Sequence, residues 1–226
     1  MTLSVGVLVS GGGSNLQALI DRIESGILDA RISTVISNVP GVKGLERAAK
    51  HGIPSQVLPH HDYPNRRAYD QALVRSLEQA DVEAVILAGF MRVVGPDLLA
   101  AFPRRVLNIH PALLPAFPGL HAQKQAAAHG VRLAGCTVHF VDEQVDHGPI
   151  IIQAAVPAQS GDDVDSLGAR ILALEHRIYP QAVQWLAQGR LKIQGRQVVL
   201  LPARVLRADP SGLPPCLIHP MLEYGF

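Results

Sequence analysis

Two polar side chains, Asn108 and His110, stand at the start of a loop that prolines make stiff. The segment VLNIHPALLPAFPG begins as an apolar strand and then carries three prolines, which a regular element does not tolerate. An amide and a protonated imidazole both donate hydrogen bonds, and such a pair suits the stabilisation of negative charge on a carbonyl oxygen in acyl transfer. The prolines would hold both donors in place before a substrate arrives. For the pair taken alone, hydrogen bonding within the loop is an equally good interpretation.

A carboxylate is the third group that this chemistry requires, and the segment VDEQVDHGPI supplies Asp142, Glu143 and Asp146. Asp146 directly precedes a His-Gly-Pro sequence, where the chain must turn back. A carboxylate beside His110 would favour the protonated ring and could act as a general base, directly or through water. Capping of the turn is the competing interpretation of Asp146. A zinc site from His110, His139 and Asp146 is a further alternative, but we expect no metal.

Three consecutive glycines join the first apolar segment to the first amphipathic one in VLVSGGGSNLQALI. Glycines let the backbone approach an anion closely, and a helix start offers unpaired N–H groups and the positive end of its dipole. Ser14 is expected to cap the helix, with Gln17 completing a capping box. A tight turn that needs positive φ is the competing interpretation, but three glycines exceed that need. We therefore expect a phosphate site at Gly12, Gly13, Ser14 and Asn15.

The residues around the glycines narrow the type of phosphate ligand. A P-loop would place a lysine after them, and none is present. The dinucleotide pattern would place a third glycine where Leu16 stands and an acidic residue where the second strand ends at Asn38. A nicotinamide cofactor is therefore disfavoured, and a small sugar phosphate fits better.

The composition indicates a globular chain and disfavours several classes of protein. The 226 residues are 48% hydrophobic and carry a formal net charge of +1 without a basic stripe, so no nucleic acid partner is expected. Two cysteines, Cys136 and Cys216, argue against a disulfide framework. We see neither a signal peptide nor an apolar run of membrane-spanning length. A soluble cytoplasmic protein without a membrane partner is expected.

Apolar segments alternate with helical periodicity through the first half of the chain. Helices are predicted between the strands, and the strands are apolar on both faces, as is typical of a parallel sheet covered by helices. The predicted fold class is α/β, with a Rossmann-like, mainly parallel twisted sheet and helices on both faces. The predicted strands are 3–9, 31–37, 54–59, 83–89 and 104–110, and the predicted helices are 14–27, 42–52 and 65–80.

The pattern changes after Gly119 and predicts an antiparallel C-terminal portion. A helix at 121–130 precedes two strands, 135–142 and 149–158, which are expected to pair. A long helix begins near Asp163, and Pro180 should kink or end it. A terminal hairpin follows at 191–201. The tail from Pro202 is expected to be either loose or an oligomer contact, so a homodimer is one expected state. We predict one domain over 1–195 and leave 196–226 without a role.

Six motifs in chain order resemble the glycinamide ribonucleotide formyltransferases of purine biosynthesis. The resemblance covers about residues 3 to 195 and implies the formyltransferase fold. It also implies transfer of a formyl group from the co-substrate 10-formyltetrahydrofolate to the amine of glycinamide ribonucleotide. The motifs are SGGGSNLQALID, SNVPGVKGLERA, LAGFMRVV, LNIHPALLPAFPGLHAQKQA, TVHFVDEQVDHGPIIIQ and LEHRIYP.

The resemblance implies roles for particular residues. The catalytic residues would be Asn108, His110 and Asp146, with no metal. The ribonucleotide would be held by Gly12, Gly13, Ser14, Asn15 and, at its ribose, Glu175. The folate would be held by Arg66, Met91, Arg92, Val93, Val94, Asn108 and Asp146. Two positions depart from the family: Leu172 replaces an expected polar residue, and His147 replaces a small one.

Three alternative functions remain at this stage. A 10-formyltetrahydrofolate hydrolase would use the same Asn, His and Asp with water in place of the amine, but it is expected to carry an N-terminal regulatory domain and has no use for a phosphate turn. A formyltransferase acting on initiator tRNA would need a further C-terminal domain and a basic surface. A non-catalytic folate or sugar-phosphate binder is the alternative from a different class.

Overall fold

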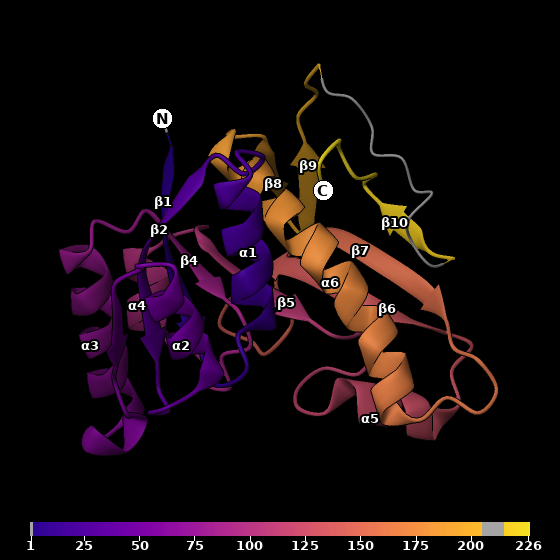
Figure 1. The fold of residues 1–226 in the computed structure, drawn as a ribbon, viewed down its shortest axis with the longest axis horizontal. Coiled ribbons are helices and arrows are strands. Elements are labelled where there is room, and N and C mark those ends of the chain that lie inside the picture. The colour runs from indigo at the N-terminus through magenta and orange to yellow at the C-terminus, as the bar shows by residue number, and fades with distance from the viewer. Residues whose placement is uncertain (1, 205–214) are drawn as a thin grey trace. The chain divides into compact units, whose positions relative to one another are not determined.

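The computed structural model describes residues 2–204 and 215–226 (Figure 1). The chain divides into two compact units, which are described separately. The N-terminal unit contains Met1–Asn108 and Phe140–Glu143, and the C-terminal unit contains Ile109–His139 and Gln144–Phe226. Among the described residues, no helix has the length and apolarity that crossing a bilayer requires.

The N-terminal unit is built on parallel strands in the order β3-β2-β1-β4-β5. Every residue of the central strand β1 is buried, which explains why this segment is apolar throughout rather than alternating. The predicted parallel sheet is confirmed. The strands are β1 (Leu3–Val9), β2 (Ala30–Ser37), β3 (Ser55–Val57), β4 (Ala84–Leu87) and β5 (Val106–His110), the last of which runs into the second unit.

Helices cover both faces of this sheet, as predicted. A Cβ on Gly6 of β1 would collide with Leu77 of α3, whereas a Cβ on Gly44 of α2 would lie 3.1 Å from Val9 of β1. Gly6 and Val9 face opposite sides because side chains alternate along a strand. The helices of this unit are α1 (Ser14–Glu24), α2 (Lys43–Lys50), α3 (Arg66–Gln79) and α4 (Pro96–Ala101), with a 3₁₀ turn at His60–Asp62.

Two local details of this unit differ from the sequence predictions. The N-cap of α1 is Gly13, at a left-handed φ of 67°, and Ser14 is already helical, so the predicted Ser14 cap is wrong. The side chain of Gln17 instead accepts a hydrogen bond from Arg47, because α2 lies against the turn. The short helix α4 was not predicted, although its first residue, Pro96, is a known signal of a helix start.

The C-terminal unit has the predicted antiparallel character. Strand β6 (Leu133–Phe140) pairs antiparallel with β7 (Ile150–Pro157), and Asp146 lies in their connection. The predicted terminal hairpin is confirmed as β8 (Leu191–Gln194) and β9 (Gln197–Leu200). Helix α5 spans Ala122–His129.

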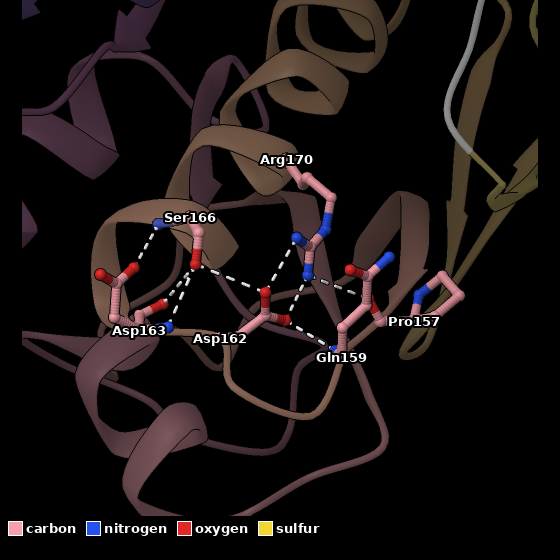
Figure 2. A network of polar contacts seen from close by, with 6 residues as sticks. All are labelled: Pro157, Gln159, Asp162, Asp163, Ser166 and Arg170. Carbon is pink, nitrogen blue, oxygen red and sulfur yellow. Dashed lines mark hydrogen bonds and ion pairs between the residues drawn. The ribbon is translucent and has the colours of Figure 1, made fainter.

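The long helix α6 (Val164–Ala187) begins with a capping box, which Figure 2 shows. The Ser166 N–H donates to Asp163 Oδ1 at 2.8 Å, and the Asp163 N–H donates to Ser166 Oγ at 3.1 Å. Arg170, one turn further, donates to Asp162 Oδ1 at 3.0 Å and so fixes the approach to the helix. The prediction that Pro180 could end this helix is wrong. The residues on both sides of Pro180 are buried, so tertiary packing outweighs the roughly 3 kcal/mol that a proline costs.

The last residues of the chain dock onto the C-terminal unit. Strand β10 (Leu217–His219) pairs antiparallel with β7, and Phe226 is buried. Arg190 donates to Glu223 Oε1 at 2.7 Å, and the Glu223 N–H donates to Gln181 Oε1 at 2.7 Å. The expectation of a loose tail is therefore wrong for 215–226, while 205–214 lie outside the described residues.

Candidate active site

The imidazole of His110 lies between two hydrogen-bond acceptors at the buried end of β5. Its Nε2 is 2.8 Å from the carbonyl oxygen of Phe117, and its Nδ1 is 3.3 Å from Oδ2 of Asp146. Only a ring that carries a proton on both nitrogens can donate to both partners. The ring therefore has an acceptor oxygen within reach of each of its two nitrogens.

Two histidine rings and one backbone N–H group surround the carboxylate of Asp146. Its Oδ2 accepts the N–H of Gly119 at 2.7 Å, and its Oδ1 lies 3.7 Å from Nε2 of His139. Burial acts to raise the pKa of Asp146, but the nearby His139 ring, the hydrogen bond from Gly119 and the charge of His110 outweigh it, so the pKa is below its usual value. The carboxylate is therefore ionised at neutral pH, and its bond to Gly119, 27 residues away, exceeds the role of a local turn cap.

The backbone at this site adopts conformations that few residues other than glycine tolerate. Phe117 and Asp146 have φ values of 53° and 51°. Left-handed backbone at bulky residues is uncommon and gathers at functional sites. Sequence reasoning did not find the Phe117 carbonyl or the Gly119 N–H, because backbone groups leave no signal in residue types beyond the nearby proline and glycine.

Two side chains from neighbouring strands hold the loop that follows His110. Thr137 Oγ1 accepts the N–H of Leu114 at 3.1 Å and donates to the Ala112 carbonyl at 2.7 Å. Gln153 Nε2 donates to the Leu114 carbonyl at 2.9 Å. The loop is therefore held by β6 and β7 as well as by its own prolines.

The zinc alternative required three side chains, His110, His139 and Asp146, to lie together. They do lie together, and His139 is buried with its Nε2 directed at Asp146. In the part of the chain that the structure describes, no group of three or more His, Cys, Asp or Glu side chains could hold a metal ion. The cluster is arranged around the Asp146 carboxylate instead.

The glycine turn of the N-terminal unit leaves the space beside it open. A Cβ placed on Gly11 or Gly12 would have no atom within 4 Å. Helix α1 begins at Ser14, and the first backbone N–H groups of a helix point out of its N-terminal end. The turn therefore has room and donors for an anion, as the phosphate prediction requires.

Five of the residues predicted to hold folate, Arg66 and Met91 to Val94, belong to the N-terminal unit. Arg66, the first residue of α3, donates to the Val94 carbonyl, and the Met91 N–H donates to Ser10 Oγ at 2.7 Å. Met91 and Val93 are 62% and 47% exposed. This loop offers apolar surface and a fixed backbone, which an aromatic ring system with polar edges could use.

Asp70 is a residue of this region that sequence reasoning missed. Its carboxylate is buried, lies 3.9 Å from Arg66 Nε and accepts a hydrogen bond from the Gly95 backbone. Burial raises the pKa of Asp70, although Arg66 and the Gly95 N–H oppose that effect. A Cβ on Gly95 would collide with this carboxylate, so Asp70 links the start of α3 to the loop that contains Met91 and Val94.

Comparison with known families then decides the family. The formyl transferase model matches residues 3–183. The chain belongs to the formyl transferase family. It is 42% identical over 191 residues to the phosphoribosylglycinamide formyltransferase of Escherichia coli K12, covering 84% of this chain and 90% of that protein. A crystal structure of glycinamide ribonucleotide transformylase 1 from Symbiobacterium toebii superposes with a TM-score of 0.88 at 53% identity, covering 89% of this chain and 95% of that one.

Two other similar proteins are longer than this chain. The trifunctional purine biosynthetic protein adenosine-3 of Drosophila pseudoobscura pseudoobscura is 54% identical over 190 residues, or 83% of this chain. This formyl transferase spans only 14% of the length of that relative. A formyltetrahydrofolate deformylase from Pseudomonas syringae pv. tomato has a TM-score of 0.83 at 27% identity, covering 89% of this chain and 67% of that one.

The remaining predicted residues of this formyl transferase lie on separate elements. Asn108 belongs to the N-terminal unit, where it pairs with Leu87 of β4. Glu175 is buried on α6, and the departure at Leu172 lies one turn before it on the same helix. The departure at His147 meets Arg196, whose Nη2 donates to the His147 carbonyl at 2.8 Å.

Proposed function

We propose that this chain transfers the formyl group of 10-formyltetrahydrofolate to the amine of glycinamide ribonucleotide. The products would be formylglycinamide ribonucleotide and tetrahydrofolate. The observation that carries the proposal is the His110 ring held between two acceptors, Asp146 and Phe117. The catalytic residues would lie within 1–195, with both substrates small molecules and with neither nucleic acid nor a membrane involved. We place the reaction in the cytoplasm.

In the proposed reaction the substrate amine attacks the formyl carbon, and a new C–N bond forms. The carbonyl oxygen becomes negatively charged and would be stabilised by the Asn108 amide and the His110 imidazolium. Asn108 and His110 suit this shared task because residues two apart in a strand point to one face. The bond from the formyl carbon to N10 of the folate then breaks, and the amine proton moves to N10. Asp146 would keep His110 protonated and assist that transfer.

The His110 Nε2 proton must change partner for this chemistry. In the structure it is directed at the Phe117 carbonyl. The formyl oxygen would take the place of that carbonyl as the acceptor. The ring would keep its number of hydrogen bonds in this exchange, while the Phe117 carbonyl would give up its donor. The Asp146 side of the ring stays held throughout, and the ring keeps its orientation.

The other predicted residues would bind the two substrates. Gly12, Gly13, Ser14 and Asn15 would hold the phosphate, and Glu175 the ribose hydroxyls. Arg66 and the loop Met91, Arg92, Val93 and Val94 would hold the folate, with Asn108 and Asp146 at its reacting end. The open glycine turn and the exposed apolar side chains of that loop support this assignment.

The test is an assay with purified protein, 10-formyltetrahydrofolate and glycinamide ribonucleotide, in which tetrahydrofolate and the formylated ribonucleotide are both measured. We expect the two products in equal amounts and no folate release when the ribonucleotide is omitted. Folate release that does not depend on the ribonucleotide would instead establish the hydrolase alternative. No release under any condition would leave a non-catalytic binder.

A further inference from the structure

The glycine turn is braced by helix α2, a feature to which no role has been assigned. The Gly44 N–H of α2 donates to the Gly11 carbonyl at 3.0 Å, and Arg47 Nε donates to the Gly12 carbonyl at 3.0 Å. Two successive carbonyl groups of the turn are therefore held by the same helix. Both contacts lie within the N-terminal unit.

Holding a carbonyl also sets the direction of the next N–H group. In a planar trans peptide, the C=O of one residue and the N–H of the next point in opposite directions. The bond to the Gly11 carbonyl therefore turns the Gly12 N–H away from α2, and the bond to the Gly12 carbonyl does the same for the Gly13 N–H. Successive N–H groups on one side of a turn form a concave anion site.

The glycine turn and α2 are packed so closely that the peptide groups of the turn have no room for another orientation. A Cβ on Gly13 would lie 2.6 Å from the Gly44 Cα, and a Cβ on Gly44 would lie 3.2 Å from the Gly11 carbonyl oxygen. The Arg47 guanidinium is held at a second edge, where Nη1 donates to Gln17 Oε1 of α1 at 3.0 Å. A lysine could not make both contacts, because its ammonium lacks the planar fork.

We infer that Arg47 is a positioning residue for the phosphate site: it locks the peptide between Gly12 and Gly13 so that the Gly13 N–H, with the Gly12 N–H that Gly44 orients and the start of α1, faces an incoming phosphate. The inference rests on the proposed function, because it concerns the phosphate group of the same substrate. Arg47 acts through the backbone of the turn, and its fork geometry matters in addition to its charge.

The experiment compares Arg47→Gln and Arg47→Lys with the control Lys43→Gln, which removes a charge from the same helix without touching the turn. Inorganic phosphate is titrated into ¹⁵N-labelled protein, and the amide resonances of Gly12 and Gly13 are followed. We expect phosphate to move both resonances in the wild type and in Lys43→Gln. Both Arg47 variants should need about 10-fold more phosphate, the loss expected for one charge-assisted hydrogen bond.

Steady-state kinetics supplies the second measurement. The KM for glycinamide ribonucleotide should rise about 10-fold in both Arg47 variants, while the KM for the formyl donor stays within about 2-fold. Wild-type phosphate affinity in Arg47→Gln would overturn the inference. Full affinity in Arg47→Lys, or an equal loss in Lys43→Gln, would also overturn it by showing that charge alone matters. Phosphate-induced shifts without ribonucleotide turnover would contradict the proposed function and leave this inference standing.

Discussion

The Nδ1 atom of His110 lies 3.3 Å from Oδ2 of Asp146, and that oxygen also accepts the Gly119 N–H at 2.7 Å. Three segments of the C-terminal unit therefore meet at one carboxylate oxygen: the end of β5, the loop after it and the β6–β7 connection. The carboxylate orients the ring, and the Gly119 N–H orients the carboxylate. This dependence of one group on the next yields most of the predictions below.

Asp146→Asn should reduce kcat by about 10²- to 10⁴-fold, the usual contribution of a positioned acid or base. The amide is nearly isosteric but cannot balance the charge of the imidazolium ring. The KM for the ribonucleotide should change little. Asp165→Asn on the exposed first turn of α6 removes the same charge and serves as the control. Activity within 10-fold of wild type would contradict a catalytic role for Asp146.

Gly119→Ala should lower both stability and kcat. Gly119 has a φ of +83°, where alanine costs about 1–2 kcal/mol, or roughly 2–8 °C in Tm for a chain of this size. The strain also moves the N–H that holds Asp146. Gly189→Ala is a matched control, since Gly189 has a φ of +65° with nothing within 4 Å of its Cβ. It should lose similar stability at full kcat, and an equal loss of kcat in both variants would refute the link to Asp146.

Stability should depend on pH in opposite directions at two aspartates. The pKa of Asp146 is lowered from 3.8, so its ionised form stabilises the fold above pH 3.8, and this contribution is lost as the pH falls through the folded-state pKa. The pKa of Asp70 is raised from 3.8 by burial, so its ionisation destabilises the fold as the pH rises from 3.8 through the raised value.

Urea unfolding of wild type, Asp146→Asn and Asp70→Asn at several pH values tests these two signs. The stability difference between wild type and Asp146→Asn should shrink as the pH falls below 3.8. As the pH falls from the raised pKa of Asp70 to 3.8, the wild type should gain stability relative to Asp70→Asn. If both stability differences changed in the same direction with pH, the environments assigned to Asp146 and Asp70 would be contradicted.

Asp70→Asn should also weaken binding of the formyl donor, because the Asp70 carboxylate holds Arg66 and the Gly95 backbone in place. We expect the KM for the donor to rise about 10-fold, with an unchanged KM for the ribonucleotide. Asp97→Asn is the comparison, since Asp97 contacts Arg67 and Gln71 on the exposed side of α3. Equal donor KM values in both variants would show that Asp70 has no positioning role.

Arg190→Met should destabilise the C-terminal unit by about 3–5 kcal/mol, because it leaves Glu223 buried without its partner. Both side chains are only 10% exposed. Arg67→Met breaks a more exposed ion pair with Asp97 and should cost less than about 1 kcal/mol. Chemical denaturation measures both. A loss below 1 kcal/mol for Arg190→Met would mean that the docked chain end adds little to stability.

The amino-acid sequence by itself determined the family, the parallel strands and the residue types of the candidate site. These follow from local patterns: apolar runs at strand positions, the glycine turn, and the Asn108, His110 and Asp146 motifs. Strands that are buried on both faces, such as β1, are easily recognised in the sequence, because polar residues do not alternate with apolar ones. The hairpin at 191–201 could also be predicted from the sequence, because its two strands and its turn follow one another directly in the chain.

Only the tertiary structure decided which groups meet. The Phe117 carbonyl, the Gly119 N–H and the Arg47 brace depend on backbone atoms that segments far apart in the chain bring together, and residue types carry no record of such contacts. Contacts between distant segments also account for the wrongly predicted cap of α1, for Pro180 inside α6 and for the docked chain end. In each case packing against distant residues outweighed a local preference worth at most a few kcal/mol.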